Sequence, residues 1–322
     1  MSENGLVDQP VEDVIETVVE REDDRNPKTV RETLDPVTDD GVVTREAVET
    51  AVSDTSKVVA TAETRTELAG IAYEDTTAAA ATVDDLDIVA TRLSRYADRL
   101  EAVEARAADL AEDLRTPVEQ LDDPNAVYEL ATELRDVATT AQGVIRTADD
   151  LAQDLDAFES WLTDPDQRYD EFTEDIDLVD ESLAELTATT DALSSNTDTP
   201  AADWADATMQ VHVLELLVAD LRVELADLRV WADREDTEFR ATVEERVADL
   251  EQQTTELKTR LAEHADPVWH DRFDNHLSTF QADLDEFEPP ADWRRVQETL
   301  QERREQIFST SQISTDELQG QK

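Results

Sequence analysis

Apolar residues recur along most of this chain at alternating spacings of three and four, and this heptad spacing is the feature that most constrains its fold. A seam of this kind keeps one face of a helix against a partner and gives left-handed packing at about +20°. No segment shows the period-two alternation of an amphipathic strand. The longest run contains Val127, Leu130, Leu134, Val137, Ala141, Val144, Ala148, Leu151, Leu155, Phe158 and Leu162. Further runs cover residues 86–114, 172–193 and 204–228.

Prolines mark the expected joints between helices. Seven of the ten prolines follow a residue that caps helix N-termini well, and proline is tolerated at the first helical position because its missing N–H has no partner there. These pairs are Asn26-Pro27, Asp35-Pro36, Thr116-Pro117, Asp123-Pro124, Asp164-Pro165, Thr199-Pro200 and Asp266-Pro267. The short connections imply antiparallel neighbours, so the sequence predicts an all-α fold of long antiparallel helices in a coiled-coil-like bundle.

The pattern suggests three regions. Residues 1–43 are expected to form a small N-terminal helical region, with helices over about 8–21 and 27–34 and a turn at Thr38–Gly41. Residues 44–308 form the predicted long-helix bundle, whose first helix has Thr44 as its N-cap. Residues 309–322 lack periodicity and are expected to be a disordered tail.

One register slip interrupts the seams. After Leu228, the residues Phe239, Val243 and Val247 are four apart before heptad spacing resumes, which is a stutter. No Pro or Gly lies between Thr208 and His264, so a continuous helix over residues 204–264 is possible. A bend or turn at residues 233–237 is the alternative, and the sequence leaves both open.

The charge balance is strongly acidic. There are 81 Asp and Glu against 28 Lys and Arg, a formal net charge of −53, and only four of the basic residues are Lys. This balance excludes a generic nucleic-acid binder, which needs clustered basic residues. Self-repulsion would be severe in dilute buffer, whereas at roughly 1 M salt the Debye length falls to about 3 Å. We therefore expect a haloarchaeal cytoplasm, with an ordinary acidic coiled coil as the alternative.

Several classes of segment and chemistry are not indicated. The N-terminus has no secretory pattern, and no apolar stretch reaches the roughly 20 residues that span a bilayer, so we expect a cytoplasmic protein without a transmembrane segment. Zero Cys excludes thiolate chemistry and cysteine metal sites, and five Gly are too few for phosphate-binding loops.

The candidate sites each have a structural explanation. Asp39–Glu46 is similar to a calcium-binding EF-hand loop but puts Pro36 at the first ligand position, so a helix–turn–helix joint is favoured. His264, His270 and His276 lie near Asp266, Asp271 and Asp274, yet His264 is separated from the others by Pro267. His270 and Asp274 can share a face, whereas His264 and His276 fall on the seams and are expected to be buried or half-buried.

No active centre emerges from the remaining residues. None of the four histidines has a Glu three residues before it, which argues against a di-iron bundle. The five tryptophans mostly lie near helix ends and are expected to plug them. The sequence therefore predicts no catalytic, cofactor-binding or metal-binding residues. The segment Trp293–Phe308 balances its charges and is expected to dock on the acidic body, or to bind an acidic partner.

Three stretches carry a resemblance. Asp39–Glu46, Val52–Arg65 and Pro200–Thr208 resemble a haloarchaeal family usually labelled "halo transducer protein", over nearly the whole chain. The resemblance implies kinship with the cytoplasmic coiled coils of archaeal sensory transducers. The chain differs in having no transmembrane helices, no linker domain and no alanine- and asparagine-rich hairpin tip. Glu251-Gln252 is its nearest match to an adaptation site, and a chance match is the favoured explanation of this pair.

The expected function is a non-enzymatic cytoplasmic interaction or signalling scaffold of a halophile. A sensory-transduction component that works by shifts of helix register is one alternative, with the stutter as its flexible point. A ligand or metal carrier built in a bundle core is the other. The heptad seams are satisfied by a protein partner, by self-association or by packing within one chain, so they do not decide the oligomeric state.

Overall fold

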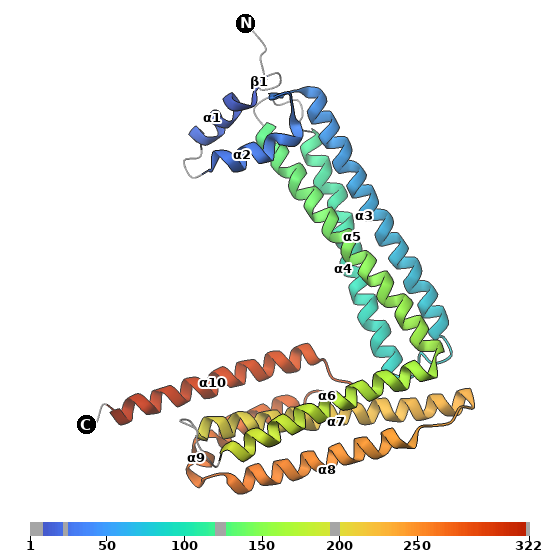
Figure 1. Ribbon diagram of the computed structural model, residues 1–322, viewed down its shortest axis with the longest axis vertical. Coiled ribbons are helices and arrows are strands. Elements are labelled where there is room, and N and C mark those ends of the chain that lie inside the picture. Colours follow the sequence, from blue (N-terminus) through green and yellow to red (C-terminus); the bar gives the residue numbers. More distant parts are fainter. Residues whose placement is uncertain (1–8, 22–24, 120–126, 194–199, 320–322) are drawn as a thin grey trace. The chain divides into compact units, whose positions relative to one another are not determined.

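The computed structural model describes residues 9–21, 25–119, 127–193 and 200–319 (Figure 1). Within these ranges the chain is almost entirely helical, as the heptad spacing predicts. The α-helices are α1 Val11–Arg21, α2 Pro27–Leu34, α3 Arg45–Ala80, α4 Asp87–Glu119, α5 Val127–Thr163, α6 Pro165–Leu193, α7 Pro200–Glu235, α8 Ala241–His264, α9 Pro267–Leu284 and α10 Trp293–Gln319. A 3-10 turn, η1, covers Asp35–Val37.

The chain forms two compact units. Unit 1 comprises Met1–Ala81 and Arg92–Ser160, and unit 2 comprises Thr82–Thr91 and Trp161–Lys322. Residues 44–308, expected as one bundle, are thus distributed over both units. No helix in the described part of the chain is long and apolar enough to cross a membrane.

Unit 1 begins with a small sheet that the helical prediction missed. Strands β1 (Gln9–Pro10), β2 (Thr38–Asp39) and β3 (Val42–Val43) pair antiparallel in the order β1-β3-β2. Asp40 and Gly41 both have positive φ, 46° and 79°, which is the arrangement of a tight hairpin turn whose twist matches that of the strands. The predicted turn is confirmed, but it joins two strands and is not a helix–turn–helix joint. Strands of two residues are too short to show alternation in a sequence.

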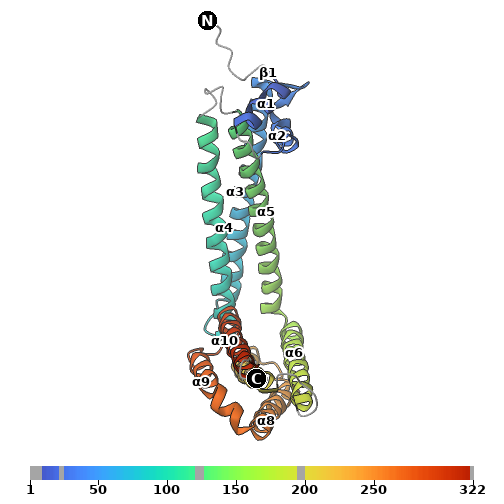
Figure 2. The ribbon, with the colours of Figure 1, turned by 90° about the vertical axis from the view of Figure 1, so that its left-hand side faces the viewer.

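The rest of unit 1 is built from α3, α4 and α5, which lie side by side (Figure 2). Thr44 accepts a hydrogen bond from the Ala47 N–H at 3.1 Å and caps α3, as predicted. The heptad positions of α5 are buried, and those from Val137 to Leu155 pack in one cluster with Val59, Ala62 and Ala69 of α3. Helices α1 and α2 share a second cluster with the starts of α3 and α5. The seams thus bury one another within the chain.

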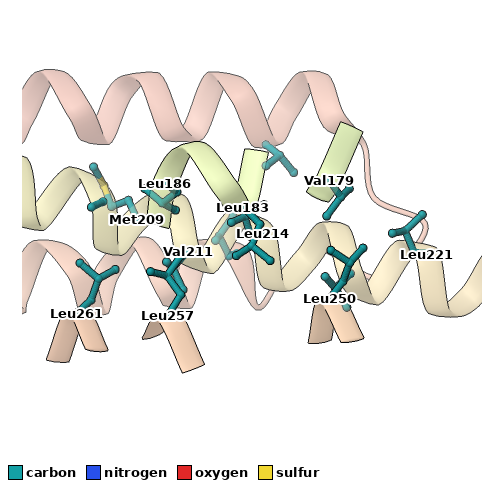
Figure 3. Close-up of a cluster of buried hydrophobic side chains, with 14 of the residues drawn as sticks. Val179, Leu183, Leu186, Met209, Val211, Leu214, Leu221, Leu250, Leu257 and Leu261 are labelled. Atoms are coloured by element: carbon teal, nitrogen blue, oxygen red, sulfur yellow. The ribbon is translucent and has the colours of Figure 1, made fainter. Parts of the chain in front are cut away.

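Unit 2 packs α6, α7 and α8 around one interior, to which each helix contributes its seam (Figure 3). The order of the ion pairs along the helices shows their relative directions. Partner numbers fall along α8 as they rise along α7, so these two helices run in opposite directions; the pairs are Glu215–Lys258, Arg222–Glu251 and Arg229–Glu244. Partner numbers rise together along α6 and α8, which are therefore parallel, in Asp177–Arg246 and Asp191–Arg260.

Helix α10 docks on this body, which confirms the first of the two expectations for the charge-balanced segment. It packs against α7 and α9 and buries Val296 and Ile307. Arg304 donates to Asp206 of α7, and Arg303 donates to Asp283 of α9 at 2.9 Å. The helix expected to end at Phe308 continues to Gln319, inside the segment expected to be disordered; no Pro or Gly interrupts these residues.

Other expected joints have mixed outcomes. The structure has a turn, not a continuous helix, between α7 and α8. Asp236 adopts a φ of 54°, and the N–H of Thr237 bonds the carbonyl of Ala232 at 2.9 Å, which is the Schellman ending of a helix. Asp266 caps α9 and Asp164 caps α6 as predicted.

The Thr116-Pro117 start is wrong, because Pro117 lies in the last turn of α4. The described part of that helix extends two residues further, to Glu119. Asp35-Pro36 begins only the 3-10 turn η1. The Asp123-Pro124 pair lies outside the described residues.

Candidate functional site

The histidines singled out in the sequence do not converge on one centre. His264 is exposed, which corrects its expected burial on the seam: it is the last residue of α8, and Leu261 is the last seam residue. Its Nδ1 lies 2.8 Å from the Arg260 carbonyl. His276 is half-buried, as expected. Over the ranges that the structure describes, no group of three or more His, Asp or Glu side chains is placed to hold a metal ion.

His270 and Asp274 do share a face of α9, as their spacing predicts. The Nδ1 of His270 lies 2.8 Å from Oδ1 of Asp274. The His270 ring also packs edge-on against Trp204 of α7, with ring centroids 5.1 Å apart. Trp204 is buried, and its Nε1 donates to the carbonyl of Leu261, one of the last carbonyls of α8, at 3.0 Å. This contact ties the start of α7 to the end of α8.

These residues border a cavity of about 200 Å³ between α7, α8 and α9. Half of its lining side chains are apolar or aromatic and half are polar, and the polar ones come from all three helices. The lining residues are Trp204, Thr208, Val211, His212, Lys258, Leu261, Ala262, His270, Asp274 and Leu277. One feature of the sequence points to this cavity: His212 and Glu215 interrupt the apolar stretch Val211–Val218 of α7.

Two of the polar lining residues, His212 and Lys258, are held by Glu215. Lys258 donates to both carboxylate oxygens at 2.8 Å, and Nδ1 of His212 lies 2.9 Å from Oε2. Burial of Glu215 opposes its charged form, but the hydrogen bonds from His212 and Lys258 outweigh it and hold the pKa of Glu215 below its ordinary value. Glu215 is therefore ionised at neutral pH and can only accept hydrogen bonds.

A second polar cluster lies where α5, α6 and α7 meet. Arg168 is buried, stacks on the Trp231 ring with its guanidinium 4.0 Å from the centroid, and donates to the carbonyl of Leu162 at 2.8 Å. It also pairs with Glu235, which accepts a hydrogen bond from Trp231 Nε1. Trp161 packs edge-on against Trp231. The cluster fixes a helix junction, and its tryptophans lie near helix ends as predicted.

The start of α4 is held on α7 by two carboxylates of opposite behaviour. Asp227 accepts from the Ile88 N–H at 2.8 Å, and its burial raises the pKa of that carboxyl. Asp85 forms a two-pronged pair with Arg234, at 2.6 Å for both contacts, and the hydrogen bond from Arg234 lowers the pKa of Asp85. These contacts position helices.

Glu251-Gln252, the nearest match to an adaptation site, is engaged in surface contacts. Glu251 pairs with Arg222 of α7, and Gln252 donates to Glu256 at 2.8 Å on the same helix. Both residues are exposed on α8.

Comparison of the chain with protein-family models, with curated proteins and with solved structures finds no match.

Proposed function

We propose that this chain is a non-enzymatic scaffold of long antiparallel, coiled-coil-like helices that works in the salt-rich cytoplasm of a halophile. The observation that carries this proposal is the placement of its few basic residues. Arginines and Lys258 lie at boundaries between helices, where they pair with carboxylates of a neighbour, as in Arg65–Asp149, Arg99–Asp154 and Arg229–Glu244. Many of the arginines and Lys258 thus join helices to one another, whereas Lys28 and Lys57 pair with carboxylates of their own helices.

This placement leaves most of the acidic residues without a basic partner of their own, because 81 acids share 28 basic side chains. Salt screens attraction and repulsion alike, but each exposed ion pair contributes only about 0–1 kcal/mol, and repulsion acts among all the remaining carboxylates. The net effect of salt on the folded state is therefore stabilising. A surface of this kind suits a protein that stays soluble at high salt and presents long helical faces to partners.

Signalling is supported by the resemblance to the halo transducer proteins. In that role the helical units would transmit a change from one partner to another. The turn at Asp236 lies just before the stutter over Phe239–Val247, which the register-shift alternative takes as its flexible point. A shift there would take the form of a changed angle between α7 and α8.

Two measurements in the full chain test the proposal. Raising KCl from roughly 0.1 M to roughly 2 M is expected to increase helicity and the melting midpoint, whereas sucrose, which does not screen charge, is the control for general stabilisation. An unchanged melt at low salt would remove the halophile assignment.

Partner binding is tested separately. Affinity co-purification from a salt-loving host, with all steps in molar KCl, is expected to retain a protein partner, and light scattering then gives the mass of the complex. A monomer that retains nothing from the host contradicts the scaffold role. A charge-matched acidic protein from the same host serves as the control for non-specific capture.

A further inference from the structure

We propose that the cavity between α7, α8 and α9 binds a small, single-ring aromatic molecule that carries an O–H or N–H donor, such as a phenol or an aromatic amine. This site goes beyond the scaffold role and does not depend on it. The proposal rests on the size of the cavity, on its apolar wall and on the hydrogen-bonding state of two histidines.

Size limits the ligand. A volume of about 200 Å³ equals six or seven water molecules at about 30 Å³ each in the liquid. This volume matches the size of one substituted ring. Val211, Leu261, Leu277 and Trp204 form the apolar floor of the cavity. The protein already covers most of each side chain, so a ligand ring would contact only the part that faces the cavity.

The two histidines select the polar group. His212 and His270 both border the cavity, and each places Nδ1 against a carboxylate, at 2.9 Å from Glu215 and 2.8 Å from Asp274. An ionised carboxylate only accepts, so Nδ1 must carry the proton in both rings. In a neutral imidazole, Nε2 is then an acceptor. Within the described part of the chain, neither Nε2 has a hydrogen-bond partner.

Charge disfavours ionic ligands. Lys258 is the lysine at the cavity, and its ammonium is already committed to both oxygens of Glu215. An anion would meet the carboxylate of Asp274 and would find no lysine free to pair with it. A neutral donor satisfies an Nε2 atom and loses little hydration energy on entering the apolar wall. A ring bearing one donor therefore fits better than a carboxylate of the same size.

The test uses phenol as the probe, with the full chain in molar KCl. Saturation-transfer NMR on the probe detects binding, and quenching of tryptophan fluorescence, excited where phenol does not absorb, gives the affinity. Anisole has the same ring but no donor, and benzoate is the anionic counterpart. We expect saturable binding of phenol at millimolar concentration, and binding of anisole and benzoate about 2- to 10-fold weaker, the range that one net hydrogen bond supplies.

Variants locate the site. His212→Phe and His270→Phe each remove one Nε2 acceptor. The variant that removes the acceptor used by phenol is expected to weaken phenol binding by about 2- to 10-fold. His264→Phe is the matched control, because His264 is exposed and does not border the cavity, and it should leave the affinity unchanged. Leu277→Trp fills the cavity and should abolish binding, provided that circular dichroism shows native helicity.

Several results would overturn the proposal. These are no saturable phenol binding, equal affinity for phenol and anisole, tighter binding of benzoate, or equal effects of the His212 and His264 variants. If Leu277→Trp fails to fold, the histidine variants and the ligand series still decide. None of these results bears on the salt dependence of folding or on the capture of a protein partner. Failure of this site and failure of the scaffold role are therefore separate results.

Discussion

Replacing Arg168 should destabilise unit 2 far more than replacing any surface arginine. The Arg168 side chain is only 3% exposed and joins three helices. It donates to the Leu162 carbonyl near the end of α5, pairs with Glu235 of α7 and stacks on Trp231. Arg168→Met keeps most of the aliphatic volume but leaves a helix-end carbonyl without its donor and Glu235 without its cation.

The magnitude follows from these contacts. A hydrogen bond to a charged group contributes about 1.5–3 kcal/mol, and a desolvated cation–π contact contributes about 2 kcal/mol. These terms do not add, and breaking a buried pair by removing one partner costs about 3–5 kcal/mol in all. We therefore expect Arg168→Met to lower the free energy of unfolding by about 3–5 kcal/mol. For a unit of this size, the melting midpoint falls by on the order of 10 °C.

Urea unfolding in molar KCl measures this loss, with tryptophan fluorescence as the probe because Trp161 and Trp231 lie in the cluster. Arg168→Lys retains the charge but loses the planar fork and should recover only part of the stability. Arg222→Met is the control. Its pair with Glu251 is exposed, at 39% and 56%, and should contribute about 0–1 kcal/mol. Equal losses for the Arg168 and Arg222 methionine variants would refute the reasoning.

Three smaller predictions concern single carboxylates. The folded-state pKa of Glu215 is lowered, so its ionised carboxylate stabilises the fold fully above the ordinary pKa of a glutamate. This stabilisation is lost as the pH falls through the folded-state pKa. Thermal melts of Glu215→Gln at acid pH should therefore show a smaller loss of stability over that range than those of the parent chain. Asp227→Ala should cost about 1 kcal/mol in urea unfolding by removing the acceptor for the Ile88 N–H, whereas Asp227→Asn, which keeps an acceptor and removes a buried charge, should be near neutral. Asp236→Gly should be neutral or stabilising by up to about 1 kcal/mol, and Asp236→Val should cost about 1–2 kcal/mol, because the residue has a positive φ; equal melts for the two variants would contradict this.

Much of the core could be predicted because heptad spacing is a local property. Every position of the seam that runs from Val127 to Leu162 is buried, and so are all the positions of the seams over 172–193 and 204–228. Thr44 and Asp266 cap their helices because an N-cap bond reaches only two or three residues along the chain. The sequence does not decide whether the helix breaks at Asp236, because the residue with positive φ there is an aspartate and not the glycine that usually marks such a helix end.

The candidate site was mostly beyond reach of the sequence. His212 and Glu215 were visible as polar interruptions of an apolar run, but Lys258 lies on the next helix and His270 on the one after that. Their meeting depends on the antiparallel pairing of α7 with α8 and on where α9 docks. Similarly, nothing near Arg168 in the sequence indicates that it would be covered by Trp231.

The sequence by itself determined that this chain is helical, where most helices begin, which face of each is buried and that its surface is acidic. These properties depend on residue type and on spacing within a few turns. Only the tertiary structure decided the division into two units, the choice of neighbour for each helix and the cavity between α7, α8 and α9. A heptad seam requires a partner but does not specify which, since every seam here presents similar Leu, Val and Ala side chains to its neighbours.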